Sequence, residues 1–452
     1  ERQWMLTGQR YYEGDTDILG RKRLVVGENG QLVEAENLAN NKLVHNFVRK
    51  LVDQKVGYLL SLPFSIQTNN EQYQKLLSEI FDKSFLRTFK NLGKEAINKG
   101  KAWLHVYYNE NGELSFKKIP SEEIIPLWRD SAHTDLDAVI RVYEVETFEG
   151  KEKKIVTKVE FWNREGIRRY ILDDNLLIPD VEAGEFVPHV TVINSDGTEQ
   201  GFNWEKVPFI CFKYNDEEIP LVKFVKSLVD DYDKQTSDNS NNLEDLPNSI
   251  YVIRNYDGTD LGEFRRNLSV FRAVKVYSDQ SGDAGVDTIS LNIDTEAFRT
   301  HIEQLRKDIY EFGRGVDTQT ERFGAERSGV ALKFLYADLD MDANIIETEF
   351  QASFEQLRWF IDQHIYNTTG QDYSDEVVDI IFNRDIIINE ADVIQNAKAS
   401  VGIISDETII ANHPWTTNVQ AELERIEAQR NRDLMRFQEY QELGEAQEDD
   451  TE

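Results

Sequence analysis

Several features that define large protein classes are scarce in this sequence. It contains a single cysteine, Cys211, so no disulfide can form within the chain, and its apolar surroundings predict a buried side chain rather than a nucleophile. No apolar run reaches the roughly 18 residues that a membrane-spanning helix needs. The polar start, Glu1 to Trp4, has no signal-peptide core. These absences predict a cytoplasmic protein without a membrane segment or redox chemistry.

Sequence motifs of catalysis are also missing. Gly100-Lys101 lacks the preceding glycine of a P-loop and is followed by Ala102, which argues against an ATPase. There is no G-x-S-x-G, no H-E-x-x-H and no cluster of cysteine and histidine residues. The seven histidines are scattered, and we expect them to pack or to lie at the surface. No catalytic residue, cofactor or metal site is predicted.

One series of carboxylates is similar to a calcium-binding loop. Asp338, Asp340, Asp342 and Glu349 match positions 1, 3, 5 and 12 of an EF-hand loop. Position 6 is Ala343, where such a loop needs glycine for its sharp turn, and the nearby apolar residues continue a helical period. A helix with a solvated acidic face is therefore the preferred interpretation. A metal-dependent hydrolase or nuclease that uses the three aspartates stays as an alternative.

Basic residues are in the minority. The chain has 51 lysines and arginines against 83 aspartates and glutamates, a net charge of −32. This balance disfavours non-specific adhesion to nucleic acid or anionic membranes. It does not exclude a nucleic-acid role, because a surface that lets a polyanion pass should repel it weakly and should lack the affinity of a basic groove.

The strongest helical pattern occupies residues 295–370. A narrow apolar seam from Phe298 to Phe312 ends at Gly313 and Gly315. The charged segment 317–329 has no apolar period and is predicted to be a loop. A second helical pattern then continues to Gly370 and would be about 50 Å long at 1.5 Å per residue. Two long helices that meet at a charged loop would hold that loop in a defined place.

The rest of the chain predicts an α+β fold, with helices first and an antiparallel sheet after them. A further helix begins near Ile219, and short strands make up an insertion over residues 246–294. The predicted helices are 43–60, 71–98, 393–404, 407–411 and 419–443, and the main predicted strands are 102–108, 114–119, 138–147, 155–163, 166–172, 209–214 and 377–389.

Several segments, in this order, give the chain a resemblance to the portal proteins of tailed double-stranded DNA bacteriophages, of the long-tailed-phage type. They span most of residues 10–430, and the last of them is the most telling. The segments are Tyr11-Tyr12-Glu13-Gly14-Asp15, residues 52–63 (VDQKVGYLLSLP), Gly100-Lys101-Ala102-Trp103, Ile119-Pro120-Ser121-Glu122, Asp230-Asp231-Tyr232-Asp233 with Ser237-Asp238, and Ser328-Gly329-Val330-Ala331-Leu332-Lys333 with Leu339.

The resemblance implies a portal fold with an α/β wing, a two-helix stem, a small β-containing clip, a long wing helix and a helical crown. Its expected boundaries are 1–218 for the N-terminal wing, 219–245 for the first stem helix, 246–294 for the clip, 295–316 for the second stem helix, 317–329 for the tunnel loop, 330–388 for the remaining wing, and 389–452 for the crown and acidic tail.

The resemblance also implies which residues meet DNA and partners. The expected DNA-contacting residues of the tunnel loop are Thr320, Glu321, Arg322, Phe323, Gly324, Glu326 and Arg327. The candidates for the stem channel are Arg299, Arg306 and Lys307, and the candidates for partner binding in the clip are Arg254, Tyr256, Arg265, Arg272 and Lys275. For the stem bases, a solvated helix face paired with Glu303 and Glu311 remains an equal alternative.

The expected function is a ring, of twelve subunits, at one vertex of the virion capsid, assembled in the host cytoplasm. An external packaging ATPase, the terminase large subunit, would thread double-stranded DNA through it, and the ring would later serve as head-to-tail connector and DNA exit channel. Other expected partners are a head-completion or tail adaptor protein and the capsid and scaffolding proteins. The alternative is another capsid ring or scaffold protein without DNA passage.

Overall fold

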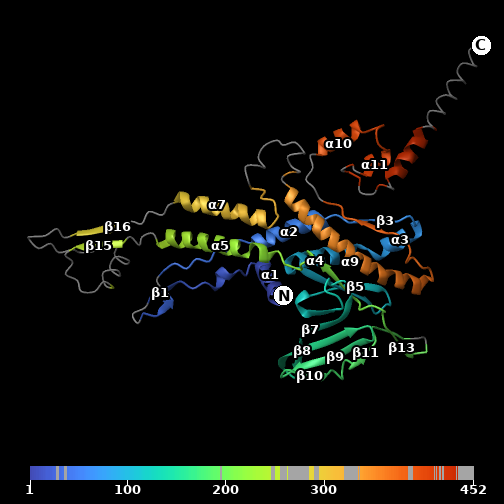
Figure 1. Ribbon diagram of the computed structural model, residues 1–452, viewed down its shortest axis with the longest axis horizontal. Coiled ribbons are helices and arrows are strands. Elements are labelled where there is room, and N and C mark those ends of the chain that lie inside the picture. Colours follow the sequence, from blue (N-terminus) through green and yellow to red (C-terminus); the bar gives the residue numbers. More distant parts are fainter. Residues whose placement is uncertain are drawn as a thin grey trace, which may run out of the picture. The chain divides into compact units, whose positions relative to one another are not determined.

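A computed structural model describes residues 1–26, 30–34, 38–193, 196–245, 250–254, 262, 285–289, 295–319, 334, 336–384, 390–411, 413, 415–416, 419, 422–433 and 435. The chain divides into two compact units. The first comprises Glu1–Asp317 with Asp338–Arg384, and the second comprises Thr318–Ala337 with Asp385–Glu452. Helices and strands are mixed throughout the first unit, which confirms the α+β prediction (Figure 1).

The main helices are α1 (Arg2–Glu13), α2 (Phe47–Leu60), α3 (Glu71–Ile80), α4 (Lys83–Lys99), α5 (Val222–Asp245), α7 (Thr295–Phe312) and α9 (Ala337–Thr369), with short 3-10 turns η1 (Asp17–Gly20) and η2 (Ser121–Glu123). The sequence predicted one helix over 71–98, which is wrong. The chain stops at Ile80 and restarts because the Asp82 carboxylate accepts a hydrogen bond from the Phe85 amide (2.8 Å) and so caps a new helix. Helix α1 was not predicted.

Two antiparallel sheets form the β part. The larger has the order β10-β9-β8-β7-β6, with β11 also paired to β9, and the smaller has the order β14-β4-β5. Their strands are β4 (Lys101–Tyr108), β5 (Leu114–Ile119), β6 (Ile124–Trp128), β7 (Leu136–Glu149), β8 (Glu152–Asn163), β9 (Gly166–Asp173), β10 (Leu176–Pro179), β11 (Phe186–Val187) and β14 (Phe209–Lys213). The β4–β5 hairpin turns at Gly112, with φ +77°, as the Asn111-Gly112 pair predicts.

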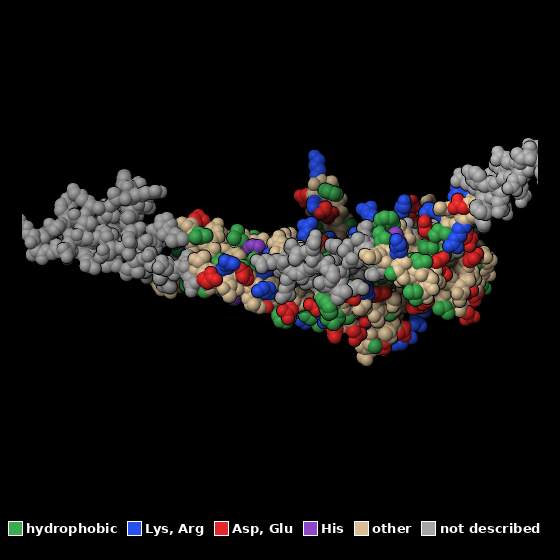
Figure 2. Space-filling model, turned by 90° about the horizontal axis from the view of Figure 1, so that it is seen from above, with side chains coloured by type: hydrophobic (Ala, Val, Ile, Leu, Met, Phe, Trp, Pro, Cys, Tyr) green, Lys and Arg blue, Asp and Glu red, His purple; other side chains and the backbone are tan. Residues whose placement is uncertain are grey.

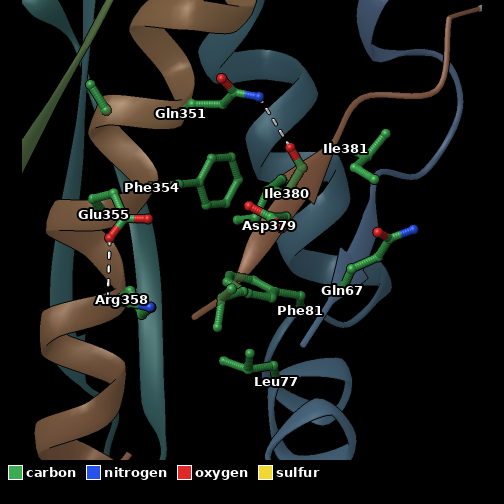
Figure 3. Close-up of a pocket in the computed structure, with 12 residues that line it drawn as sticks. Gln67, Leu77, Phe81, Gln351, Phe354, Glu355, Arg358, Asp379, Ile380 and Ile381 are labelled. Atoms are coloured by element: carbon green, nitrogen blue, oxygen red, sulfur yellow. Dashed lines mark hydrogen bonds and ion pairs between the residues drawn. The ribbon is translucent and has the colours of Figure 1, made fainter. Parts of the chain in front are cut away.

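Four two-stranded pairs complete the strands: β1 (Leu24–Val26) with β2 (Leu32–Glu34), β12 (Val190–Ile193) with β13 (Glu199–Phe202), β15 (Ile250–Arg254) with β16 (Gly285–Ile289), and β17 (Asp379–Ile381) with β3 (Ser65–Gln67). The strand predicted over 377–389 is therefore only three residues long within the described part of that range. Figure 3 shows β17 beside α9, where Gln351 donates a hydrogen bond to the Ile380 carbonyl (3.3 Å).

Helix α9 is the centre of the core of the first unit. Its 33 residues span about 50 Å, and it ends before Gly370, whose φ is +74°, as predicted. Phe350 and Phe354 are buried on it and pack against Phe89 of α4 and Phe212 of β14 in edge-on or tilted pairs, with ring centroids 5.1–5.9 Å apart. The core therefore joins helices and the smaller sheet.

A second cluster packs between the two sheets around Trp103, Val139 and Trp162. Cys211 lies in this cluster, and burial raises the pKa of its thiol to about 12, which confirms the prediction of an inert buried side chain.

The second unit contains α10 (Glu390–Ala399), α11 (Asp406–Ala411) and a helical segment over residues 422–433. These agree in part with the helices predicted at 393–404, 407–411 and 419–443. Residues 400–404 instead form a turn, closed by hydrogen bonds from the amides of Ile403 and Ile404 to the Ser400 carbonyl.

One partly buried histidine ring of the sheet region makes stability depend on pH. His105 contacts the Pro208 carbonyl through Nδ1 (2.9 Å), and burial lowers the pKa of its imidazole from 6.5 to about 4. Because this pKa is lower in the folded state, the unfolded chain binds more protons between pH 6.5 and 4, and stability falls as pH drops through this window. We expect His105→Gln to remove on the order of 2 kcal/mol of that fall, as measured by urea unfolding at pH 4.5 and 7. Identical pH slopes for the variant and the wild type would contradict this.

Candidate functional site: a helix pair and the anchor of the following loop

Helices α5 and α7 lie side by side and run in opposite directions, with the β15–β16 pair beyond their far ends (Figure 1). Leu305 and Ile309 are buried on α7, and His301 Nε2 lies 3.1 Å from the Asp231 carboxylate of α5. Phe312, which the sequence placed in the same seam, is 59% exposed. The seam ends before Phe312, because Leu51 of α2 lies close against Gly313 and Gly315 just beyond it.

The base of α5 is fixed by buried carboxylates. Asp233 is fully buried and accepts hydrogen bonds from the Thr16 hydroxyl (3.0 Å) and the His45 amide (2.9 Å). The Ser237 hydroxyl, one turn further, accepts a hydrogen bond from the Leu43 amide (2.9 Å). Two of the family-like residues on α5, Asp233 and Ser237, therefore attach the helix to the N-terminal region.

A second contact holds α5 to α1. The Tyr11 hydroxyl donates a hydrogen bond to Asp230, and Lys226 pairs with both Asp230 (2.6 Å) and Asp17 (2.5 Å). The hydrogen bond from Lys226 lowers the pKa of the Asp17 carboxyl to about 2, so this carboxylate stays charged in mild acid.

The chain that leaves α7 is tied to α2. The side-chain amide of Gln54 makes two hydrogen bonds with the backbone of Val316, donating to its carbonyl (3.0 Å) and accepting from its amide (2.8 Å). A Cβ on Gly315 would come within 2.3 Å of the Leu51 side chain, so a larger residue here would require Leu51 to shift. Arg314 adopts a left-handed conformation, φ +48°, and its carbonyl accepts a hydrogen bond from Lys55 (3.0 Å).

The chain that enters α9 is tied to the same helix. Lys55 Nζ pairs with Asp342 (2.7 Å), and both side chains are almost completely buried. Asp342 also accepts from the Tyr214 hydroxyl (2.9 Å), and Tyr58 donates to Asp340 (2.9 Å). Burial lowers the pKa of Lys55, and the Asp342 carboxylate opposes that shift.

We call these contacts of Gln54, Lys55 and Tyr58 with Val316, Asp340 and Asp342 the loop anchor. The three α2 residues lie within about one turn of helix, and they hold the chain on both sides of residues 318–337. The sequence analysis missed this role. A usable signal was present, because Lys55 falls on the apolar face of its helix with Leu51, Val52 and Leu59, where a lysine requires a buried anion.

A third ionic cluster surrounds two of the other family-like segments. Glu95 accepts from Lys99 (3.2 Å) and from the Ser121 amide (2.8 Å), and Lys101 pairs with Glu218 (2.5 Å). A Cβ on Gly100 would lie 2.2 Å from the Glu218 carbonyl oxygen. These segments thus have structural roles at the junction of α4, the small sheet and the start of α5.

The stem candidates differ in their surroundings. Arg299 is exposed and pairs with Glu303 (2.9 Å), whereas Arg306 makes two hydrogen bonds to Asp317 (2.6 and 2.8 Å). Lys307 is exposed. Arg306 therefore ties α7 to the start of the predicted loop, and its charge is already balanced by Asp317.

The remaining site candidates lie outside the described residues. This applies to the loop residues Thr320, Glu321, Arg322, Phe323, Gly324, Glu326 and Arg327 and to the clip residues Tyr256, Arg265, Arg272 and Lys275. Of Arg254, the last residue of β15, only the backbone is described.

The aspartates of the alternative enzyme hypothesis do not converge. Asp340 and Asp342 point to opposite sides of α9, since two residues turn the helix by about 200°, and they pair with different cations, Arg384 and Lys55. Asp342 is also buried, so the predicted solvated acidic face is wrong at that residue. In the described part of the chain, no group of three or more histidine, cysteine, aspartate or glutamate side chains could hold a metal ion.

Basic and acidic side chains are mixed over the face shown in Figure 2, and no continuous basic stripe runs along it. None of the described helices is both long and apolar enough to cross a membrane.

Comparisons with known proteins agree with this architecture. The family described as "Phage portal protein, SPP1 Gp6-like" matches residues 1–434. The chain is 35% identical over 432 residues to the portal protein of Clostridium phage phiCD119, which covers 93% of this chain and 91% of that protein. It is 31% identical over 430 residues to the portal protein of Bacillus phage SPP1, with 94% and 84% covered.

The chain belongs to the phage portal proteins, in the SPP1 Gp6-like family. It is therefore a component of the virion at the portal vertex of the capsid, it works as an oligomeric ring through which DNA passes, and it is not an enzyme. This confirms the predicted class. It overturns the alternatives of a nuclease and of a capsid scaffold without DNA passage.

Breaking the loop anchor at its buried ion pair should strongly destabilise the subunit. We expect Lys55→Met to destabilise the subunit by about 3 kcal/mol, because Asp342 loses its buried cation and keeps only the more exposed Arg314 (3.3 Å) as a partner. The double variant Lys55→Met/Asp342→Asn should recover part of the lost stability. Chemical unfolding of the two single variants and the double variant measures this coupling. Arg49→Met, at an exposed position of the same helix, is the control and should change stability by less than about 0.5 kcal/mol. Additive losses at positions 55 and 342 would contradict the coupling.

Proposed function

We propose that α5 and α7 form the stem of the portal ring and that residues 317–329 form a tunnel loop that projects into the channel and touches DNA. In this proposal, residues 1–218 and 330–388 are the wing, 246–294 the clip and 389–452 the crown, in a ring of twelve subunits. The observation that carries it is the loop anchor, because a loop whose two ends are held by one helix keeps its position in every subunit.

The charges around the loop favour transient contact with DNA. Arg306 neutralises Asp317, which leaves Arg322 and Arg327 against Glu321 and Glu326. A loop with equal numbers of positive and negative charges can contact phosphates without the large release of counterions that accompanies binding in a basic groove. The mechanism is therefore passive: an external packaging ATPase drives the DNA, and the loop and stem make contacts that break at each step.

The clip and crown would serve the other partners. The chain runs along α5 to the β15–β16 pair and returns along α7. The lobe is therefore connected to the rest of the subunit through these two helices. Such a lobe suits binding of the terminase large subunit during packaging and of a head-completion or tail adaptor protein afterwards. Arg254, Tyr256, Arg265, Arg272 and Lys275 are the proposed contact residues, and the ring would also contact capsid and scaffolding proteins.

Replacing residues 321–326 by a glycine-serine linker of equal length tests the proposed loop. We expect rings of normal mass and a loss of packaged DNA, because assembly does not need the loop and translocation does. The measurements are ring mass and DNA retained per particle in a packaging assay. Normal packaging by this variant would refute the loop's role.

A second variant tests the anchor as the device that positions the loop. Gln54→Ala leaves the amide and carbonyl of Val316 without their partner, so we expect rings to assemble while packaging slows several-fold. Gln74→Ala is the matched control, since the Gln74 side-chain amide bonds a single exposed backbone carbonyl, that of Ile66. Equal packaging rates for the two variants would show that the anchor does not act on translocation.

A further inference from the structure

Two grooves on the first unit carry opposite charges that form no ion pair with any residue the structure describes. The basic groove, of about 340 Å³, has an apolar floor that includes Leu62, Pro63 and Phe382. Its rim is formed by Lys83, Arg87 and Lys90, which lie on one face of α4 at spacings of four and three residues. All three are exposed, and none forms an ion pair with any residue that the structure describes.

The acidic groove, of about 640 Å³, lies where α5, the end of α7 and α9 meet. Its rim carries Asp216, Glu217, Glu311 and Glu349, and none of the four carboxylates has an ion-pair partner among the described residues. Phe224 and Phe312 border the groove and are exposed by 47% and 59%. Exposed aromatic rings inside a polar rim are typical of a protein interface.

The half-buried Glu349 lies close to other acidic side chains in this groove. Burial raises the pKa of its carboxyl, and Asp216 and Glu217 add to the shift, while Lys213 opposes it. A cation from outside would relieve this repulsion.

The two grooves face different neighbours. Asp342, Ile345 and Glu349 of α9 line the acidic groove. On the same helix, Asn344, Glu347 and Gln351 lie roughly half a turn away. That side of α9 contacts Ile380 and Arg384, which flank Phe382 of the basic groove in sequence. The grooves thus lie on opposite sides of α9.

A ring of identical subunits needs this arrangement. Every subunit in a closed ring presents one surface to the neighbour on one side and a different, complementary surface to the neighbour on the other. We propose that the basic groove of one subunit docks on the acidic groove of a second copy of this chain, with Lys83, Arg87 and Lys90 meeting Asp216, Glu217, Glu311 and Glu349. The proposal rests on the ring that the family implies and is independent of the tunnel loop.

Charge reversal tests this pairing. Variant A carries Lys83→Glu, Arg87→Glu and Lys90→Glu, and variant B carries Asp216→Lys, Glu217→Lys and Glu311→Lys. Like charges then meet at every interface of A alone or of B alone, so each should stay at single-subunit mass. In an equal mixture, the grooves of A match those of B, and rings of alternating subunits should form. Mass photometry or sedimentation at low salt measures both results.

Three controls make the result decisive. Lys151→Glu/Lys153→Glu/Arg164→Glu reverses three exposed charges on the larger sheet and should assemble as the wild type does. Circular dichroism melts of A and B establish that each subunit is folded. If a reversed variant does not fold, Lys83→Gln/Arg87→Gln/Lys90→Gln replaces it and should shift ring formation to higher protein concentration by tenfold or more.

The proposal is overturned if A or B forms rings alone, or if the folded variants fail to assemble when mixed. It is also overturned if A forms normal rings but loses DNA binding, since the basic face would then belong to a DNA contact. The mass of the assembly tests the pairing of the grooves, whereas DNA retention in intact rings tests the proposed loop function. The two proposals can therefore fail separately.

Discussion

The whole arrangement depends on the hold that α2 has on the chain at both sides of the segment 318–337. Gln54 fixes the backbone after α7, while Lys55 and Tyr58 fix the first turns of α9. The central contact is a buried ion pair, and such a pair is costly to form, because both charges lose their hydration. Such an ion pair is useful where a fixed geometry is needed more than added stability, because its hydrogen bonds are satisfied in only one arrangement of the partners.

The residues that resemble those of portal proteins share this structural role. Asp233 and Ser237 attach α5, Lys55 and Tyr58 hold the ends of the loop, and Gly100 with Lys101 joins α4 to the start of α5. None of them is placed to meet DNA by these contacts. The similarity to known portal proteins is therefore explained, in the described residues, by the construction of a frame that holds two helices and one loop.

Much of the frame could be predicted from sequence, because periodicity reports local structure directly. The long helix ending at Gly370, the hairpin at Gly112, the helix that ends at Gly313 and the buried Cys211 all appear as expected. The break at Asp82 was missed, since a single capping carboxylate outweighs a continuous apolar pattern. Within the described residues 377–384, the strand was predicted too long, since only Asp379–Ile381 pair with β3.

The contacts between distant segments could not be predicted. Gln54 and Val316 lie 262 residues apart, and nothing in the local pattern of either predicts that they meet. The two grooves are equally hidden, since the spacing of Lys83, Arg87 and Lys90 is ordinary for a solvated helix. Only the three-dimensional arrangement reveals that they form no ion pair with the described residues and border one groove.

The attachment of both sides of residues 318–337 to one helix has a consequence for how this protein can evolve. When both ends of a segment are fixed, lengthening it carries only a logarithmic entropic penalty, about 0.6 kcal/mol for each doubling. Insertions, deletions and substitutions between the two attachment points can therefore accumulate without destabilising the surrounding fold. If this segment is the proposed tunnel loop, changes in one short stretch of the gene would alter the contact of the ring with the genome and leave the frame intact.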